Sequence, residues 1–420
     1  MRALKVIGIV VLAIVVASAV SLGAFLWSER QTTTHTQAEL EPFYTPPSPL
    51  PVGKPGDIIR SEMMANVALN GATGYRVLYL TENVHKELVA SSAMLFVPNA
   101  PARPGSRKVV AWAHPTVGMG DECAPSRVAE PMKTLTWVQG MINQGWVVTA
   151  TDYAGLGTPG IEYYLVGKSE AMDVINSVRM AQRFPNSGAG STYAVYGHSQ
   201  GGHSSLWTGE ISAQYAPELK LVGVAGAAPA AEMVPLVDQQ WDTVIGWVIG
   251  PEAMISWPAT YPNVTAAQVA SDAGTKRYEQ VARDCLIEAG ITGTVEEKLG
   301  SSVFGFNPAE NPEWNAAATD QTPKPLPASV PSLVVQSVND GVVIANTTSL
   351  LERKWCAAGS PLQVDWLGPL SSTPTETHSL TGMVGGPLAT DWIQDRFAGR
   401  PAPNSCSQTP AVAPFAPKKS

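Results

Sequence analysis

Runs of hydrophobic residues alternate with helix-like segments along most of the chain. Strand-like runs recur from residue 75 onward, and amphipathic segments separate the later ones. This alternation is typical of a mostly parallel sheet with helices on both faces. The strand-like runs are residues 75–81, 90–97, 108–113, 146–151, 191–196, 219–225, 332–338 and 362–366. We therefore predict an α/β fold with a doubly wound, mostly parallel sheet, in which the first two strands form a hairpin.

The helix-like segments predict where the sheet is covered and where the alternation stops. From residue 231 to 327 the chain is helix-biased, irregular and rich in aromatic residues, so we expect an inserted helical cap there. The predicted core comprises residues 56–230 and 328–400, and residues 401–420 are expected to form a flexible tail. Helices of the core are expected at residues 128–143, 167–184, from 200 onward, before 355 and at 388–397.

The amino terminus resembles an export signal. Arg2 and Lys5 precede an apolar run from Val6 to Trp27, which is about long enough to cross a bilayer. Small residues inside this run offer a cleavage site, but the run continues past them, so residues 1–27 are either a signal peptide or a signal anchor. Both interpretations predict an extracytoplasmic protein, secreted or anchored by this segment. Residues 28–55 are polar and then proline-rich, which predicts an extended tether.

Composition and charge exclude one class of partner. The 420 residues are 45% hydrophobic and only 15% charged, which predicts a large buried core. The formal net charge is −8, and no local cluster of Lys and Arg compensates for it. Because phosphate backbones are bound by basic surfaces, nucleic acid is not an expected partner.

Four cysteines agree with an oxidising compartment, where an even number usually means disulfides. No two of them form a C-x-x-C pair, and the whole chain has six histidines, so metal ligation is a poor interpretation. We expect neither a metal nor a cofactor. Spacing alone leaves the pairing open among the disulfide candidates Cys123, Cys285, Cys356 and Cys406.

The most informative motif is Gly197-His198-Ser199-Gln200-Gly201-Gly202, which lies between a strand-like run and a helix-like segment. It is typical of a nucleophile elbow, in which a serine occupies a tight strand-to-helix turn between glycine-sized residues. The backbone amide of Gln200 and the positive end of the helix would stabilise the oxyanion of acyl transfer. Because the pattern occurs once, we predict Ser199 as the nucleophile of a serine hydrolase.

The order serine, acid, histidine along the chain identifies the other catalytic candidates. Only His203 and His378 follow the serine, and His203 lies within the elbow helix, so we predict His378, in a loop, as the base. Asp340 is the predicted acid, because it ends a buried strand-like run. Asp365 lies in mid-strand and Glu376 stands too close to the histidine along the chain, so both are weaker candidates.

A second oxyanion donor is expected from the loop after an early strand. Residues 109–113 run into His114-Pro115-Thr116. Because proline has no amide hydrogen, Pro115 cannot donate, and Thr116 is the predicted backbone donor. His114 is expected to orient this loop through a hydrogen bond rather than to transfer a proton.

Several segments together resemble the secretory lipase family of α/β-hydrolases, which is related to fungal lipase A. The resemblance spans about residues 56 to 406, and it implies an α/β-hydrolase fold, a helical cap and a Ser-Asp-His triad. Pro115 departs from the family pattern, in which glycine is common at this position. The segments are residues 56–62, 114–126 (ending Cys-Ala-Pro-Ser), 152–160 and 197–202. The implied triad is Ser199, Asp340 and His378, and the implied disulfides pair Cys123 with Cys285 and Cys356 with Cys406.

These features predict an exported serine carboxylic ester hydrolase of the lipase or esterase type, acting through an acyl-enzyme on a small-molecule or lipid-like ester. Membrane contact is expected only if the N-terminal segment stays uncleaved, and no oligomeric state is indicated. An acyltransferase is a second interpretation, since an alcohol could replace water in deacylation. A catalytically silent envelope binding protein is a third, which Pro115 favours and the intact serine, acid and histidine disfavour.

Overall fold

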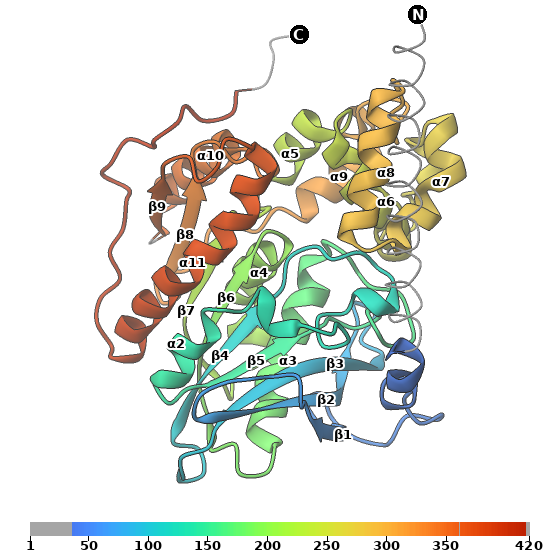
Figure 1. Ribbon diagram of the computed structural model, residues 1–420. Coiled ribbons are helices and arrows are strands. Elements are labelled where there is room, and N and C mark those ends of the chain that lie inside the picture. The colour runs from blue at the N-terminus through green and yellow to red at the C-terminus, as the bar shows by residue number, and fades with distance from the viewer. Residues whose placement is uncertain (1–35, 361, 417–420) are drawn as a thin grey trace, which may run out of the picture. The chain divides into compact units, whose positions relative to one another are not determined.

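A nine-stranded sheet lies at the centre of the computed structural model, which describes residues 36–360 and 362–416 (Figure 1). The strand order is β1-β2-β3-β5-β4-β6-β7-β8-β9. The strands are β1 (Ile58–Met63), β2 (Ala72–Glu82), β3 (Leu88–Pro98), β4 (Arg107–Ala113), β5 (Val147–Thr151), β6 (Ala189–His198), β7 (Lys220–Ala227), β8 (Ser332–Ser337) and β9 (Leu362–Leu367).

The direction of the strands divides the sheet into two parts. β1, β2 and β3 pair antiparallel, and β3 pairs antiparallel with β5. From β5 to β9 every pair is parallel, and Trp112 of the central strand β4 lies between Ala150 of β5 and Tyr196 of β6. The predicted hairpin and mostly parallel sheet are confirmed. Because parallel strands end at the same edge, the loops after β4, β6 and β8 converge there.

Helices cover both faces of this sheet, as the doubly wound prediction requires (Figure 1). On one face α3 (Gly167–Arg183), α4 (Gln200–Tyr215) and α10 (Ala345–Ala357) share an apolar layer. On the other face α2 (Val138–Asn143) and α11 (Pro374–Phe397) share a second layer. Burial of these two layers supplies most of the hydrophobic stabilisation of the fold, at about 25 cal/mol for each Å² of apolar surface removed from water.

The helix predicted at residues 128–143 is mostly wrong. Only α2 is α-helical in this stretch, and a short 3₁₀ turn, Pro131–Lys133, precedes it. Pro131 lacks the amide hydrogen that a helix interior requires, so it begins a new turn and does not continue one.

The last helix is longer than predicted, because α11 begins at Pro374 rather than at residue 388. Its middle contains Gly385, Gly386 and Pro387, which normally break a helix. Packing explains the two glycines. A Cβ atom on Gly386 would lie 2.3 Å from the Trp137 ring, and one on Gly385 would lie 2.8 Å from the hydroxyl of Tyr196.

Between β7 and β8 the chain forms a group of helices, called here the α5–α9 region (Figure 1). Helix α6 contacts α5, α7 and α8, and α5 contacts α9. Trp247 and Trp257 of α6 and Trp314 of α9 are buried in its apolar centre. The helices are α5 (Met233–Gln240), α6 (Val244–Thr260), α7 (Asp272–Arg283), α8 (Leu286–Lys298) and α9 (Pro312–Asp320).

The two ends of the described chain differ from the tether and tail that the sequence predicts. Residues 36–44 are helical, not extended. The segment after residue 400 is held to the core, since the amide of Phe415 donates to the Asn346 carbonyl and the Ser349 hydroxyl donates to the Val412 carbonyl, both at 2.9 Å. The predicted export signal, residues 1–27, lies outside the described residues. Within residues 36–360 and 362–416, no helix has the length and apolarity needed to cross a membrane.

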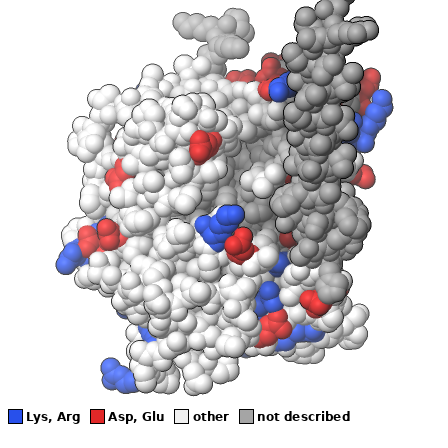
Figure 2. Space-filling view, in the orientation of Figure 1, with Lys and Arg blue, Asp and Glu red and all other residues white. Residues whose placement is uncertain are grey.

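Charged side chains are spread thinly over the surface. On the face shown in Figure 2, Lys and Arg lie singly or beside Asp and Glu. Elsewhere, pairs such as Arg179 with Glu218 and Lys354 with Glu232, each with a 2.7 Å contact, neutralise one another locally. The face in view offers no continuous basic track for a phosphate backbone.

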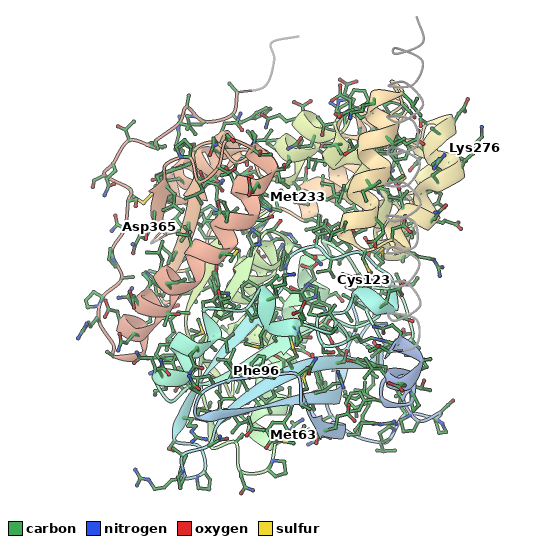
Figure 3. The ribbon with its side chains drawn as sticks, viewed as in Figure 1. Met63, Phe96, Cys123, Met233, Lys276 and Asp365 are labelled. Carbon is green, nitrogen blue, oxygen red and sulfur yellow. A yellow bond between two sulfur atoms is a disulfide. The ribbon has the colours of Figure 1, made fainter. Side chains whose placement is uncertain are left out.

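The structure contains two disulfides, and they are the pairs that the family resemblance implies. Cys123–Cys285 joins the loop after β4 to the N-cap of α8, across 162 residues of sequence (Cys123 is labelled in Figure 3). Cys356–Cys406 joins the last turn of α10 to the C-terminal segment, across 50 residues. The first bond therefore connects the α5–α9 region to the sheet domain covalently.

Replacing both Cys123 and Cys285 by serine is expected to lower the free energy of unfolding by about 2–5 kcal/mol, because the unfolded chain gains the entropy of a long open loop. Chemical denaturation of the purified protein measures this loss. The matched Cys356→Ser, Cys406→Ser variant opens a shorter loop and should lose less. An equal or larger loss in the second variant would contradict the loop-closure explanation.

Candidate active site

Ser199 lies on the turn between β6 and α4, with φ of 56° and ψ of −116°. This left-handed conformation is strained for a residue with a side chain, and such strain is concentrated at functional sites. Neighbouring backbone holds the turn. The amide of Ser199 donates to the Ala227 carbonyl of β7 at 2.9 Å, and its carbonyl accepts from the amide of His203 at 3.0 Å. The local geometry is the strand-turn-helix arrangement expected of a nucleophile elbow.

Two glycines make this turn possible. A Cβ atom on Gly201 would lie 1.9 Å from the Ala113 carbonyl oxygen at the end of β4. One on Gly197 would lie 1.9 Å from the Gly201 carbonyl oxygen. The first turn of α4 therefore packs directly against the end of β4, which brings the loop after β4 next to Ser199.

His378 and Asp340 form a buried pair. The Nδ1 atom of His378 lies 2.9 Å from Oδ2 and 3.1 Å from Oδ1 of Asp340. Oδ1 also accepts the backbone amides of Val342 and Val343, at 2.9 and 3.0 Å, and Oδ2 accepts the side-chain amide of Gln336 at 3.3 Å. These donors fix the carboxylate, which in turn orients the imidazole.

The secondary structure around His378 differs from the predicted loop, because the residue lies in the first turns of α11. The start of this helix is held against the turn that carries Asp340. The amide of Gly341 donates to the Pro374 carbonyl at 3.1 Å, and a Cβ atom on Gly341 would lie 2.5 Å from the Pro374 side chain. A helix start held in this way positions the histidine more rigidly than a loop would.

His198, the residue before the serine, contacts His378 and is absent from the sequence-based prediction. Its Nε2 atom lies 3.0 Å from the His378 carbonyl oxygen, and the two rings are 4.7 Å apart. Burial, together with the nearby His378, lowers the pKa of His198 well below its usual value. This neutral ring braces the backbone of His378. In the sequence, only its position inside the elbow motif could have indicated that His198 lies at the site.

Ser199 and His378 line the same cavity, which has a volume of about 660 Å³. Thr116 and Gln200 line it as well, so the two predicted oxyanion donors lie at its wall. Most of the remaining wall is apolar and comes from the α5–α9 region, including Met233, Leu236, Trp241, Ile245, Trp257, Ile291, Phe304 and Trp314.

The loop after β4 is braced by buried polar groups. The ring nitrogens of His114 lie 2.7 Å from the Pro115 carbonyl and 3.2 Å from the Asp152 carbonyl, which fits the orienting role predicted for it. The hydroxyl of Thr116 lies 2.8 Å from the hydroxyl of Tyr164. Tyr164 is therefore a second support of this loop, and it comes from a segment to which no role was assigned from sequence.

The other candidate acids and histidine lie apart from the His378 ring. His203 points into the fold, with its ring nitrogens 3.4 Å from Glu170 and 2.7 Å from the Gln321 carbonyl. Asp365 lies on the edge strand β9 (Figure 3), where it accepts the side-chain amide of Gln363. Glu376 is exposed and accepts the hydroxyl of Ser371.

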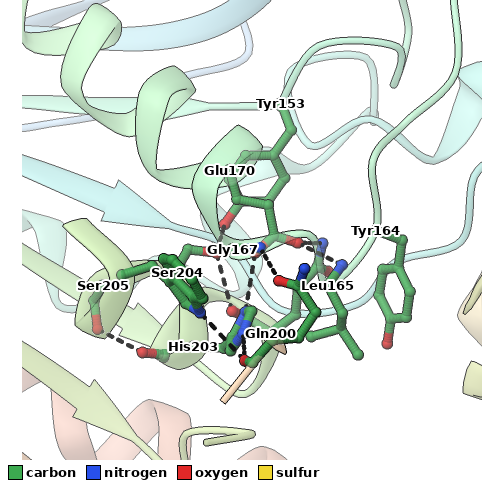
Figure 4. Close-up of polar contacts among 12 residues, drawn as sticks. Tyr153, Tyr164, Leu165, Gly167, Glu170, Gln200, His203, Ser204 and Ser205 are labelled. Carbon is green, nitrogen blue, oxygen red and sulfur yellow. Dashed lines mark hydrogen bonds and ion pairs between the residues drawn. The ribbon is translucent and has the colours of Figure 1, made fainter. Parts of the chain in front are cut away.

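A cluster of buried carboxyl groups lies beside the elbow, and sequence analysis did not detect it. Glu170 of α3 accepts three hydrogen bonds, from the Leu165 amide, the Gln200 side chain and the Ser204 hydroxyl, and its Oε2 atom lies 3.4 Å from Nδ1 of His203 (Figure 4). Glu162 accepts one, from the Gln200 side-chain amide at 3.2 Å. Burial raises the pKa of Glu162 to about 8 and raises that of Glu252, on α6, well above its usual value.

Known proteins resemble this chain over most of its length. It is 25% identical over 389 residues to a protein named "Probable inactive lipase MT1628" from Mycobacterium tuberculosis, which covers 86% of this chain and 82% of that protein. The rice cell wall degrading esterase LipA from Xanthomonas oryzae has a TM-score of 0.69 at 21% identity, covering 83% of this chain and 100% of the esterase.

Lipase A from Candida antarctica, in its closed state, has a TM-score of 0.68 at 20% identity and covers 89% of both chains. At such identities the two solved structures show the fold, which is that of the α/β-hydrolases. The family model described as secretory lipase matches residues 129–405, about two thirds of the chain. The chain belongs to the secretory lipase family.

Proposed function

We propose that this protein is an exported serine carboxylic ester hydrolase that acts on lipid-like esters. One observation carries the proposal: the strained Ser199 and the histidine of the His378–Asp340 pair line a single, largely apolar cavity. Membership of the secretory lipase family supports the same reaction class.

The proposed reaction follows from the orientation of His378. Because its Nδ1–H donates to Asp340, the Nε2 atom carries the lone pair that takes the proton of Ser199. The serine oxygen then attacks the ester carbonyl, and the histidine returns the proton to the leaving alcohol. Water, activated by the same histidine, releases the acid from the acyl-enzyme. The four hydrogen-bond donors around Asp340 hold its carboxyl group in place beside the imidazolium.

The oxyanion is proposed to bind the backbone amides of Gln200 and Thr116. Gln200 begins α4, so its amide lies at the positive end of a helix dipole. Thr116 follows a proline that has no amide to offer, and its hydroxyl is held by Tyr164 at 2.8 Å. Tyr164 thus supports the loop at the residue after Pro115, the position at which the family commonly has glycine.

The apolar wall indicates the class of substrate. The α5–α9 region is proposed to act as a cap that closes over the acyl chain, because its helices supply most of the apolar lining. Export is proposed from the two disulfides and from the apolar segment of residues 6–27. The names of the related lipases and of the related esterase agree with an ester substrate.

Loss of catalysis is the one rival that a specific observation favours, because the related Mycobacterium tuberculosis protein is named a probable inactive lipase and Pro115 departs from the family pattern. A fluorophosphonate probe distinguishes the two functions. Covalent labelling of the wild-type protein that disappears in Ser199→Ala supports the hydrolase. A wild-type protein that is folded but resists labelling, under conditions that label other serine esterases, would favour a binding protein.

Asp340→Asn should lower kcat about 10⁴-fold while KM changes little, because the amide stabilises the wrong tautomer of His378. Hydrolysis of p-nitrophenyl butyrate measures both constants. Asp365→Asn is the matched control, since this acid contacts Gln363 on an edge strand and should leave kcat unchanged. The assignment of the acid is refuted if the control loses activity and Asp340→Asn keeps it.

Tyr164→Phe should lower kcat about tenfold, because loss of one buried hydrogen bond frees Thr116 and weakens oxyanion binding by about 1.4 kcal/mol. Tyr163→Phe, at the neighbouring and more exposed position, serves as the control. The measurement is kcat on the same ester. Equal activity of the two variants would show that the hydroxyl of Tyr164 does not support the oxyanion site.

The cavity predicts a preference for longer acyl chains. Each methylene buried in an apolar wall contributes about 0.8 kcal/mol, so kcat/KM should rise up to about fourfold per methylene from acetyl to octanoyl esters. A series of p-nitrophenyl esters measures this slope. Activity confined to acetyl esters would contradict the lipid-like substrate.

A further inference from the structure

We infer that Glu162 is a positioning residue for the oxyanion donor Gln200, and that it acts as a neutral carboxylic acid paired with the Gln200 side-chain amide. The inference rests on the proposed function, because it concerns the backbone amide next to Ser199. Glu162 contacts neither the substrate nor the triad in this role. Its ionisation would set the highest pH at which the enzyme is fully active.

Two orphaned oxygen atoms reveal this pair. The side-chain NH₂ of Gln200 donates to Oε1 of Glu162 at 3.2 Å and to Oε1 of Glu170 at 2.9 Å. The remaining oxygens of the pair, Oε2 of Glu162 and Oε1 of Gln200, are both buried without a hydrogen-bond partner among the described residues. Both atoms are acceptors when Glu162 is ionised, and a buried acceptor without a donor is destabilising. A proton on Oε2 of Glu162 turns this acceptor into a donor, while Oε1 keeps the hydrogen bond from the Gln200 side-chain amide.

The neighbours of Glu162 favour this proton. Burial, with Glu170 and Asp173 of α3 nearby, raises the pKa of the Glu162 carboxyl to about 8. Glu252 approaches it from α6, and its own pKa is raised by burial and then by Glu162 and Glu170. The other titratable groups that face this cluster are Tyr153 and Tyr164, from the loops before α3, and His203 of α4, which contacts Glu170.

Glu170 and Glu162 have different surroundings, which assigns different roles to them. The oxygens of Glu170 accept hydrogen bonds from the Leu165 amide, the Gln200 side chain and the Ser204 hydroxyl, and one of them contacts His203 (Figure 4). Glu162 receives only the amide of Gln200, so it is the member of the pair that keeps a proton. The hydrogen-bond donors of this buried site can stabilise one negative charge, and a second negative charge, on Glu162, would have too few donors.

The position of Gln200 connects this pair to the proposed reaction. Gln200 is the first residue of α4 and directly follows Ser199, so its side chain anchors the peptide whose amide faces the oxyanion. Ionised Glu162 would place a second negative charge beside the carboxyl group of Glu170, which shares the Gln200 side-chain amide with it. Repulsion between the two groups would then displace the amide and release this peptide. The donor is held in place only while Glu162 is neutral.

The direction of the pH effect follows from linkage. The folded protein keeps on Glu162 a proton that the unfolded chain releases near pH 4.5. Its stabilising contribution is therefore fully present below that pH and is lost as the pH rises through about 8. Thermal stability should therefore fall between pH 4.5 and about 8 and level off above that value. The kcat should fall on the alkaline side of about 8, although a histidine base alone would stay active there.

The test compares the pH profiles of kcat and KM for wild type and Glu162→Gln on p-nitrophenyl butyrate. Glutamine reproduces the donor and acceptor of a neutral acid but cannot ionise, so the alkaline fall in kcat should move upward by at least about one pH unit. Glu313→Gln, at an exposed position of α9, is the matched control and should keep the wild-type profile. An alkaline limb that is the same in wild type and Glu162→Gln overturns the inference.

A second measurement does not depend on turnover or on the variant. The infrared spectrum of folded wild type should contain the C=O stretch of protonated carboxyl groups at pH 7, and the part of this band that is missing in Glu162→Gln should be lost with a midpoint near pH 8. A weaker band in Glu162→Gln than in wild type assigns the missing intensity to Glu162. Absence of a protonated carboxyl at pH 7 overturns the inference, even if the variant fails to fold. If wild type shows no turnover at any pH, the proposed function fails, while the infrared result still decides the protonation of Glu162.

Discussion

The close contact between the first turn of α4 and the end of β4 determines the geometry of the whole site. Gly201 lies so near the Ala113 carbonyl that no side chain fits between them. This contact places the loop of Pro115 and Thr116 beside Ser199, and it forces the serine into its left-handed conformation. The strain is sustained because parallel strands on both sides of β6 hold the turn. Any insertion at this contact would separate the proposed nucleophile Ser199 from Thr116, the proposed second oxyanion donor.

The site shows what sequence periodicity can and cannot predict. The strands and the triad candidates were predictable, because apolar runs and a glycine-bounded serine are local signals. The start of α11 was not, since Gly385 and Gly386 resemble helix breakers and their packing against Trp137 and Tyr196 is visible only in three dimensions. The carboxyl cluster was also missed. Glu162 and Glu252 are ordinary charged residues in the sequence, and only the fold buries them together.

Three layers of support surround the proposed nucleophile, and each comes from a different part of the chain. The sheet supplies Ser199 and Asp340 at the ends of parallel strands, as this fold class generally does. Helix α11 supplies His378, whose backbone is braced by His198. The loop before α3 supplies Tyr164 and Glu162, one on each proposed oxyanion donor. A loop without a recognisable motif therefore contacts both proposed oxyanion donors.

The Cys123–Cys285 disulfide has a mechanical consequence for the α5–α9 region. It fixes the N-terminal end of α8, and the Leu286 amide, which donates to the Val117 carbonyl at 2.9 Å, reinforces the same point. The opposite end of α8, near Leu299, has no such covalent link. Any displacement of this helix therefore has to leave its N-terminal end in place beside the loop after β4.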